Sequence, residues 1–214
     1  MKIGIITSGG DAPSMNACIR AVVRSALDND IEVCGFYRGY KGILENDIVE
    51  LKRTSVSDMI QRGGTFLQTD RCDEWREKEY RIKGAEILKQ NNIDYLVVIG
   101  GDGSFNGALK LYEDTGFKVI CIPATIDNDI PSTVYTMVFD TCLNTSCRCV
   151  SDTNDVFVSH RGIALIELMG KGCPDVTVRS AIANNATYMV TKYSKLKPEG
   201  FLKIARAGFA KGKP

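Results

Sequence analysis

The chain lacks most features that would indicate metal–thiolate chemistry, a highly charged partner or a membrane. It has a single histidine, and no two of its eight cysteines are spaced Cys-x-x-Cys. Lys and Arg number 27 against 26 Asp and Glu, so the net charge gives no reason to expect nucleic acid or an anionic membrane as partner. No apolar run reaches transmembrane length, and the first residues turn polar too early for a signal peptide. A cytoplasmic protein is predicted.

Several common catalytic and binding motifs are also missing. Cys147 and Cys149 lie two residues apart without a second ligand pair, which disfavours a zinc site, and His160 has no evident catalytic partner. No Walker A sequence occurs, and from Gly101 the glycine spacing is Gly-x-Gly-x-x-x-Gly, which differs from the dinucleotide fingerprint. The second expected strand also lacks an acid at its carboxyl end to hold a ribose. A dehydrogenase is therefore a poor fit.

Apolar runs and helical patterns alternate along the chain. We expect strands at 2–6, 32–37, 95–99, 118–122 and 163–169, the last of them buried, and helices at 14–28, 55–61, 73–91, 104–114, 139–150, 174–186 and 197–210, with 38–53 irregular. This alternation is typical of a parallel sheet with helices on both faces. The predicted fold class is α/β, with doubly wound Rossmann-like parallel sheets in two lobes, the second incomplete.

Three of the expected strands end in loops of small and polar residues, at 7–11, 100–107 and 123–129. In an open parallel α/β sheet, ligands bind where the strands reach their carboxyl ends. The first two loops offer glycines and free backbone N–H groups at the start of a helix, an arrangement that suits phosphate. The loops together predict a phosphoryl-transfer site.

The loop at 100–107, Gly-Gly-Asp-Gly-Ser-Phe-Asn-Gly, gives the clearest phosphate signal. Its glycines would let a polyphosphate approach the backbone, and Ser104 could cap the following helix. Asp102 follows the strand directly, where one carboxylate could hold a Mg²⁺ ion that bridges nucleotide phosphates.

The loop at 123–129 carries polar side chains at alternate positions, Thr125, Asp127 and Asp129. Alternation would place them on one side of an extended segment. Two carboxylates so close repel each other unless a cation or a proton-donating substrate lies between them. One of them could accept the proton of an attacking hydroxyl, with Arg71 and Lys171 as candidate cations for the transferred phosphoryl group.

Five short motifs follow one another along the chain: Thr7-Ser-Gly-Gly-Asp-Ala-Pro, Arg62-Gly-Gly-Thr, Ile99-Gly-Gly-Asp-Gly-Ser, Thr125-Ile-Asp-Asn-Asp and Glu167-Leu-Met-Gly. In this order and spacing they resemble the bacterial ATP-dependent 6-phosphofructokinases, and the resemblance covers the whole chain. It implies transfer of the γ-phosphoryl group of ATP to the 1-hydroxyl of fructose 6-phosphate, with Mg²⁺. It also implies a cytoplasmic homotetramer that acts in glycolysis, with a nucleotide-binding lobe at 1–138 and part of a substrate-binding lobe at 139–214.

The resemblance assigns roles residue by residue. Asp127 would be the general base, with Thr125, Asp129 and Lys171 beside it, and Asp102 would be the Mg²⁺ ligand. The nucleotide would be bound by Gly10, Arg71, Cys72, Gly101, Asp102, Gly103, Ser104 and Gly107. The sugar phosphate would be bound by Thr125, Asp127, Met169, Gly170 and Lys171. An effector would be bound by Arg20, Arg24, Arg53, Asp58, Lys211 and Lys213.

The chain departs from the family pattern at several positions. Lys171 and Gly162 each stand where the family has an arginine. Smaller departures are Ser14, Ala124, Asn154 and Thr187. The family's chains also continue past position 214, so we expect the isolated chain to be marginally stable, prone to aggregate and of little activity, with weak Mg-ATP binding retained. Two alternatives stay open, a pyrophosphate-dependent phosphofructokinase and a nucleotide- or effector-binding protein without catalysis.

Overall fold

The computed structural model describes residues 1–194 and 196–210. Contacts divide the chain into two compact units. The first unit comprises Met1–Thr125 and Asp129–Val138, and the second comprises Ile126–Asn128 and the residues from Phe139 onward. None of the helices in the described ranges has the length and apolar character needed to span a bilayer.

A five-stranded sheet with the order β3-β2-β1-β4-β5 forms the centre of the first unit. Its strands are β1 (Lys2–Ser8), β2 (Glu32–Phe36), β3 (Ile48–Glu50), β4 (Tyr95–Gly100) and β5 (Val119–Pro123). All neighbours pair in parallel except β2 and β3, which pair antiparallel at the edge. The predicted α/β fold with a largely parallel sheet is confirmed.

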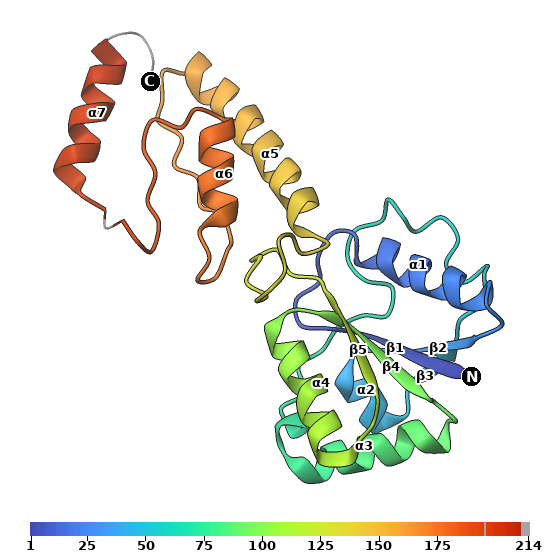
Figure 1. Cartoon of the computed structure of the whole chain (residues 1–214). Coiled ribbons are helices and arrows are strands. Elements are labelled where there is room, and N and C mark those ends of the chain that lie inside the picture. Colours follow the sequence, from blue (N-terminus) through green and yellow to red (C-terminus); the bar gives the residue numbers. More distant parts are fainter. Residues whose placement is uncertain (195, 211–214) are drawn as a thin grey trace. The chain divides into compact units, whose positions relative to one another are not determined.

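Helices cover both faces of this sheet (Figure 1). They are α1 (Met15–Leu27), α2 (Tyr40–Glu45), α3 (Lys78–Gln90) and α4 (Asp102–Thr115). Figure 1 shows α1 on one face and the other three helices on the opposite face. Successive strand residues point to opposite faces, so Ile6 and Val98 enter the core beneath α2, α3 and α4, whereas Ile5 and Val97 face the side of α1.

Two local predictions in the first unit are wrong. The segment 38–53, expected to be irregular, contains α2 and β3, and α2 is flanked by residues with positive φ, Gly39 and Asn46. The helix expected at 55–61 is absent, and turns occupy that segment. Short elements of this kind depend on tertiary contacts, because a helix of two turns is not stable by itself.

The second unit is helical within the described residues. It contains α5 (Phe139–Ser159), α6 (Asp175–Ala183) and α7 (Pro198–Ala210), and α5 packs against α6. The buried strand predicted at 163–169 is wrong: the segment is irregular, and the side chains of Leu165 and Met169 are 94% and 77% exposed. A strand needs a partner for its backbone groups, and the described part of this unit pairs in β fashion only at the bridge between Thr191 and Ser194.

A buried arginine joins the helices beneath the sheet. Arg81 on α3 is 6% exposed, and its Nε donates to Asp114 Oδ2 on α4 at 2.6 Å. Its Nη1 donates to the carbonyl oxygens of Trp75 and Arg76 at 2.8 and 2.6 Å. The hydrogen bond from Arg81 lowers the pKa of the Asp114 carboxyl group.

This ion pair should make the first unit sensitive to acid. The pKa of Asp114 is lower in the folded state than in the unfolded state. The ion pair therefore adds to the free energy of unfolding above the unfolded pKa of about 4, and this stabilisation is lost as pH falls through the folded pKa. We expect Asp114→Asn to lower the free energy of unfolding at pH 7, and the deficit to shrink towards pH 3. Urea unfolding, followed by the fluorescence of the single tryptophan, buried Trp75, measures this.

The matched control is Asp73→Asn, which removes an ion pair with Arg76 in which both side chains are more than 80% exposed. Exposed pairs contribute little, so this change should have almost no effect at either pH. An equal deficit for Asp114→Asn at pH 7 and pH 3 would contradict the assignment.

Gly39, just before α2, lies against the carboxyl end of β1. Its φ is +64°, and a Cβ there would stand 2.7 Å from the Thr7 carbonyl oxygen. Gly116, at the end of α4, has a similar φ of +68° but open space around it. Gly39 combines this overlap with a ψ of −133°, a backbone conformation open essentially to glycine alone, whereas Gly116 has an ordinary left-handed ψ of 9°.

We expect Gly116→Ala to lower the free energy of unfolding by about 1 kcal/mol, which is the typical penalty for placing a residue with a Cβ in left-handed backbone. Gly39→Ala should lower the free energy of unfolding by about 1–3 kcal/mol more, because its backbone angles suit glycine alone and the end of β1 has to move. Denaturant unfolding of both variants measures the difference. Equal costs would show that Gly39 does not limit the approach of α2 to β1.

Candidate functional site

The loop after β1 brings glycines next to the first turn of α4. Gly9 has a φ of +90°, and a Cβ there would lie 3.4 Å from Ser104 Oγ. Gly10 has no atom of the described residues within 4 Å of its Cβ position, so its backbone faces open space among them. Ser14 is the N-cap residue of α1, with a left-handed φ of 78°. The predicted loops at 7–11 and 100–107, which are far apart in the sequence, are therefore neighbours in the first unit.

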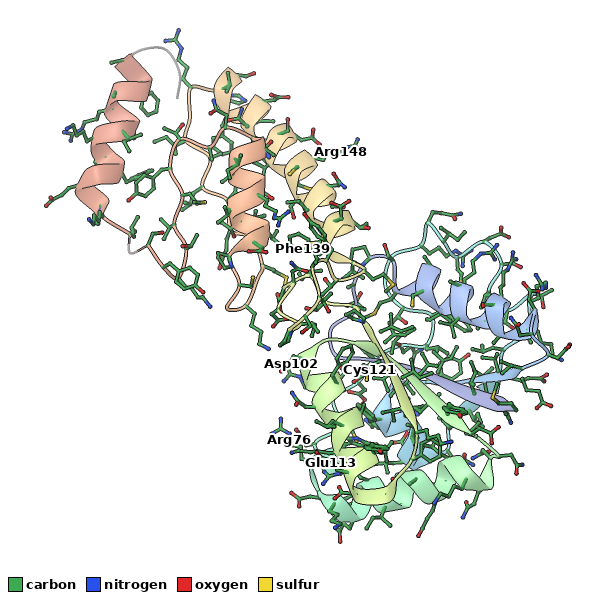
Figure 2. All side chains as sticks on the ribbon, in the orientation of Figure 1. Arg76, Asp102, Glu113, Cys121, Phe139 and Arg148 are labelled. Atoms are coloured by element: carbon green, nitrogen blue, oxygen red, sulfur yellow. The ribbon has the colours of Figure 1, made fainter. Side chains whose placement is uncertain are left out.

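The loop after β4 leads directly into α4. Gly101 is the N-cap residue, and Asp102 lies exposed in the first helical turn, at the end of α4 in Figure 2. Asn106 Nδ2 donates to the Asp102 carbonyl oxygen and to Oδ2, at 3.1 and 3.2 Å. The predicted capping role of Ser104 is wrong, because this residue is buried inside the first turn. A helix amino end favours anions, so phosphate and the Asp102 carboxylate both suit this position.

The predicted nucleotide-binding glycines of α4 have different surroundings. Gly103 has open space at its Cβ position, which leaves room for a ligand. Gly107 instead faces the rings of Tyr40 and Trp75, with Tyr40 Cε2 3.1 Å from its Cβ position. The structure therefore gives Gly107 a packing role in addition to any contact with a ligand.

Two buried aromatic residues that the sequence analysis missed hold the amino end of α4. The rings of Tyr40 and Trp75 stack with their centroids 4.5 Å apart. The Tyr40 hydroxyl donates to the Ser104 carbonyl oxygen at 2.6 Å, and Trp75 Nε1 donates to the Gly107 carbonyl oxygen at 3.3 Å. Burial raises the pKa of Tyr40, which keeps its hydroxyl protonated as a donor. The apolar residues within 38–53 were the signal that could have revealed Tyr40.

Arg71 and Cys72 lie on the segment that leads to Trp75. Arg71 is exposed, and Cys72 is half-buried with its Sγ 3.6 Å from Glu74 Oε2. Burial raises the pKa of the Cys72 thiol. The preceding residue, Asp70, pairs with Lys41 Nζ at 2.7 Å, and this hydrogen bond lowers the pKa of the Asp70 carboxyl group. The pair ties the segment to α2.

The segment after β5 begins beside the glycine loop. A Cβ on Gly101 would lie 3.3 Å from Thr125 Cβ, and the Ala124 N–H donates to the Gly100 carbonyl oxygen at 2.8 Å. The expected extended run over 125–129 is wrong, because 126–127 form a turn and Asn128 has a φ of +53°. Thr125 and Asp129 belong to the first unit and Asp127 to the second, so strict alternation does not relate the three side chains.

The remaining predicted sugar-phosphate residues belong to the second unit. Met169 is largely exposed, and a tight turn follows in which the Cys173 N–H donates to the Gly170 carbonyl oxygen at 2.7 Å. Lys171 lies in this turn with a φ of +51°. The turn replaces the carboxyl end of the strand that the sequence analysis expected here.

The predicted effector residues of the first unit lie on α1 and on the segment after β3. Arg20 Nη1 donates to the Val56 carbonyl oxygen at 2.7 Å, and Arg53 pairs with Asp28. Arg24 Nε is buried and has no hydrogen-bond partner among the residues that the structure describes. Asp58 is exposed, and Lys211 and Lys213 lie outside the described residues. The effector role of this set stays a prediction.

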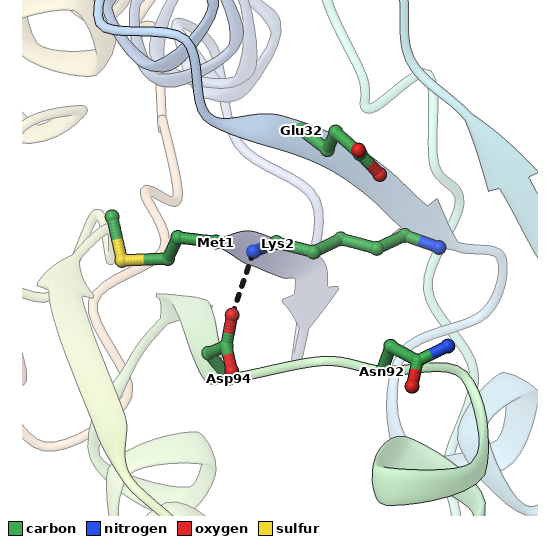
Figure 3. Close-up of a pocket in the computed structure, with 5 residues that line it drawn as sticks. All are labelled: Met1, Lys2, Glu32, Asn92 and Asp94. Atoms are coloured by element: carbon green, nitrogen blue, oxygen red, sulfur yellow. Dashed lines mark hydrogen bonds between the residues drawn. The ribbon is translucent and has the colours of Figure 1, made fainter.

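A hollow of about 350 Å³ lies elsewhere, at the amino ends of β1 and β2 (Figure 3). It is lined by Met1, Lys2, Glu32, Asn92 and Asp94. The Asp94 carboxylate accepts a hydrogen bond from the Lys2 backbone N–H at 2.8 Å, the dashed line in Figure 3. None of the predicted site residues that the structure describes lines this hollow.

Comparison with known proteins identifies the family. The phosphofructokinase family model matches residues 2–214. An ATP-dependent 6-phosphofructokinase of Vibrio cholerae is 50% identical over 212 residues, which are 99% of this chain and 66% of that protein. Among solved structures, phosphofructokinase from Saccharomyces cerevisiae has a TM-score of 0.87 at 29% identity, over 99% of this chain and 32% of that one.

A pyrophosphate-dependent phosphofructokinase from Marinobacter aquaeolei has a TM-score of 0.81 at 19% identity, over 95% of this chain and 56% of that one, and this likeness shows the fold alone. The chain thus spans just under two thirds of the length of the Vibrio cholerae relative. The family model, the identity and the fold agree, and we conclude that the chain belongs to the phosphofructokinase family.

Proposed function

We propose that the chain acts as an ATP-dependent 6-phosphofructokinase, or as the part of one that binds the nucleotide. The observation that carries the proposal is that three of the predicted segments meet at the carboxyl edge of the sheet in the first unit. There the loop after β1, the amino end of α4 and Thr125 lie side by side, with open space at Gly10 and Gly103. The relative from Vibrio cholerae is an enzyme of this name.

The residues at this edge fit a Mg²⁺ ion that is shared with a nucleotide. The described residues contain no group of three or more His, Cys, Asp and Glu side chains placed to hold a metal. Mg²⁺ in nucleotide sites is commonly held by one or two carboxylates plus substrate phosphates, and the exposed Asp102 can supply one. When bound, the ion would neutralise charge on the phosphates.

The proposed reaction is a displacement at the γ-phosphorus of ATP. The 1-hydroxyl oxygen of fructose 6-phosphate forms a bond to this phosphorus, and the bond to the bridging oxygen of ADP breaks. Asp127 accepts the hydroxyl proton, as catalytic aspartates do in kinases. Thr125 and Asp129 are proposed as further catalytic residues, and Thr125, Met169 and Gly170 would contact the sugar phosphate. Lys171 would stabilise charge on the transferred group.

The partners proposed for the chain follow from this reaction. They are ATP with Mg²⁺, fructose 6-phosphate and, by resemblance, further copies of the chain in a cytoplasmic homotetramer. Gly10, Gly101, Gly103 and Ser104 would bind phosphates, and Arg71, Cys72 and Gly107 would complete the nucleotide site.

Substitution of the two key aspartates should separate catalysis from nucleotide binding. Asp127→Asn keeps the shape of the side chain but cannot accept a proton, so turnover should fall about 10²–10⁴-fold with Mg-ATP binding nearly unchanged. Asp102→Asn should instead weaken Mg²⁺-dependent ATP binding. Calorimetric titration with and without Mg²⁺, together with a coupled assay, measures both. Equal loss of binding in the two variants would contradict this division of roles.

The phosphoryl donor should be ATP in preference to pyrophosphate. Gly103 and Ala124 are small where the pyrophosphate-dependent branch carries Asp and Lys, so space remains for the nucleotide. In a coupled fructose 6-phosphate assay, the rate with Mg-ATP should exceed the rate with Mg-pyrophosphate. Gly103→Asp should reduce the ATP rate, because it adds a carboxylate beside Asp102. Faster turnover with pyrophosphate would overturn the choice of donor.

A further inference from the structure

The motif Arg62-Gly-Gly-Thr has no role in the proposed reaction, yet its loop, residues 62–68, lies at the carboxyl end of β1. The Thr7 hydroxyl is fully buried and donates to the Gln68 carbonyl oxygen at 2.8 Å. Since that uses the only hydroxyl hydrogen of Thr7, the Thr65 hydroxyl donates in the 3.0 Å bond between the two threonines. Thr7, the penultimate residue of β1, thus fixes both ends of the Thr65–Gln68 turn.

A second anchor comes from the first turn of α1. Asn16 is 4% exposed, and its Nδ2 donates to the carbonyl oxygens of Arg62 and Gly63 at 3.1 and 3.2 Å. Its Oδ1 accepts the Phe66 N–H at 2.6 Å. One buried amide therefore makes three hydrogen bonds to a single loop. Such a network fixes the loop, because the buried Asn16 amide would be left unsatisfied if the loop moved away.

The anchored loop faces the predicted phosphate loop. A Cβ on Gly64 would lie 3.7 Å from Asp11 Oδ2, which places the two loops side by side. Within the described part of the chain, Gly63, like Gly10, has no atom within 4 Å of its Cβ position. Exposed arginines, Arg62 and Arg71, stand at the start of the loop and just beyond its end. Open glycine backbone flanked by guanidinium groups suits a polyphosphate.

We propose that the 62–68 loop is a further wall of the polyphosphate site, and that Asn16 and Thr7 are the positioning residues that hold it there. The inference rests on the proposed function, because the ligand is the phosphate chain of Mg-ATP. The loop continues directly into Arg71 and Cys72. Its two anchors therefore also set where those predicted nucleotide contacts lie.

The first test is Asn16→Asp in the chain of 214 residues. The carboxylate keeps an acceptor for the Phe66 N–H but loses both donors and repels two carbonyl oxygens. Mg-ATP affinity, measured calorimetrically well below the thermal midpoint, should fall about 10- to 100-fold, the range typical when a residue that orients a ligand-binding group is lost. Hydrogen exchange should accelerate within 62–72, with less change elsewhere in the first unit.

The matched control is Asn29→Asp, which makes the same change of charge just after α1. Asn29 is exposed, and among the described residues its Nδ2 donates only to the carbonyl oxygen of Ser25 in the last turn of α1. Its Mg-ATP affinity should stay within about twofold of the unsubstituted chain, since an exposed charge is screened by salt.

The second test uses the other anchor and does not depend on the folding of Asn16→Asp. Thr7→Val keeps the shape but removes the hydroxyl group, and it should weaken Mg-ATP binding and accelerate exchange within 62–72. Thr7→Ser restores the hydroxyl and should rescue both. A purely structural role would instead shift the thermal midpoint without a selective loss of Mg-ATP affinity.

The outcomes separate this inference from the proposed function. If the unsubstituted chain binds Mg-ATP and both Asn16→Asp and Thr7→Val bind it equally well, the inference alone is overturned. If the unsubstituted chain binds no Mg-ATP, the nucleotide role and the polyphosphate wall are overturned together. Selective loss of affinity with local release of the 62–72 segment, rescued by Thr7→Ser, supports the inference.

Discussion

The parallel pairing of β1 with β4 is the constraint on which the candidate site depends. Its register sets Ser8 opposite Gly100, so the loops that follow β1 and β4 leave the sheet at the same level. The approach is close, because a Cβ on Gly100 would stand 2.5 Å from the Ser8 carbonyl oxygen. Parallel strands place both carboxyl ends at one edge, and the glycine-rich loops consequently become neighbours.

The packing of the helices against the sheet fixes the position of α4 at this edge. Tyr40 and Trp75 bond to carbonyl oxygens in the first turns of α4, and Arg81 ties its far end to α3. The helix is thus held at both ends, and its amino terminus keeps a fixed position beside the loop after β1. A fixed helix terminus with an exposed Asp102 offers backbone N–H groups and a carboxylate without rearrangement.

The sequence predicted the elements of the first unit where the pattern was long and regular. Strands β1, β2, β4 and β5 and helices α1, α3 and α4 agree with periodicity, because alternating burial and helical spacing leave a direct trace in residue order. It failed for α2, β3 and the segment 163–169, where burial depends on partners. The apolar run at 163–169 is exposed in the described structure, since composition does not show whether a neighbouring strand exists.

What the sequence determined by itself was the set of loops and the prediction of a phosphate site. Glycines after an apolar run predict such a site because they let a phosphate approach the backbone N–H groups, and an aspartate beside them offers a carboxylate to a metal ion. Only the tertiary structure decided that Asn16 and Thr7 hold the 62–68 loop, and that 126–127 form a turn. These bonds join residues about 50 positions apart, as between Asn16 and Phe66, and such contacts leave no periodic signal in the chain.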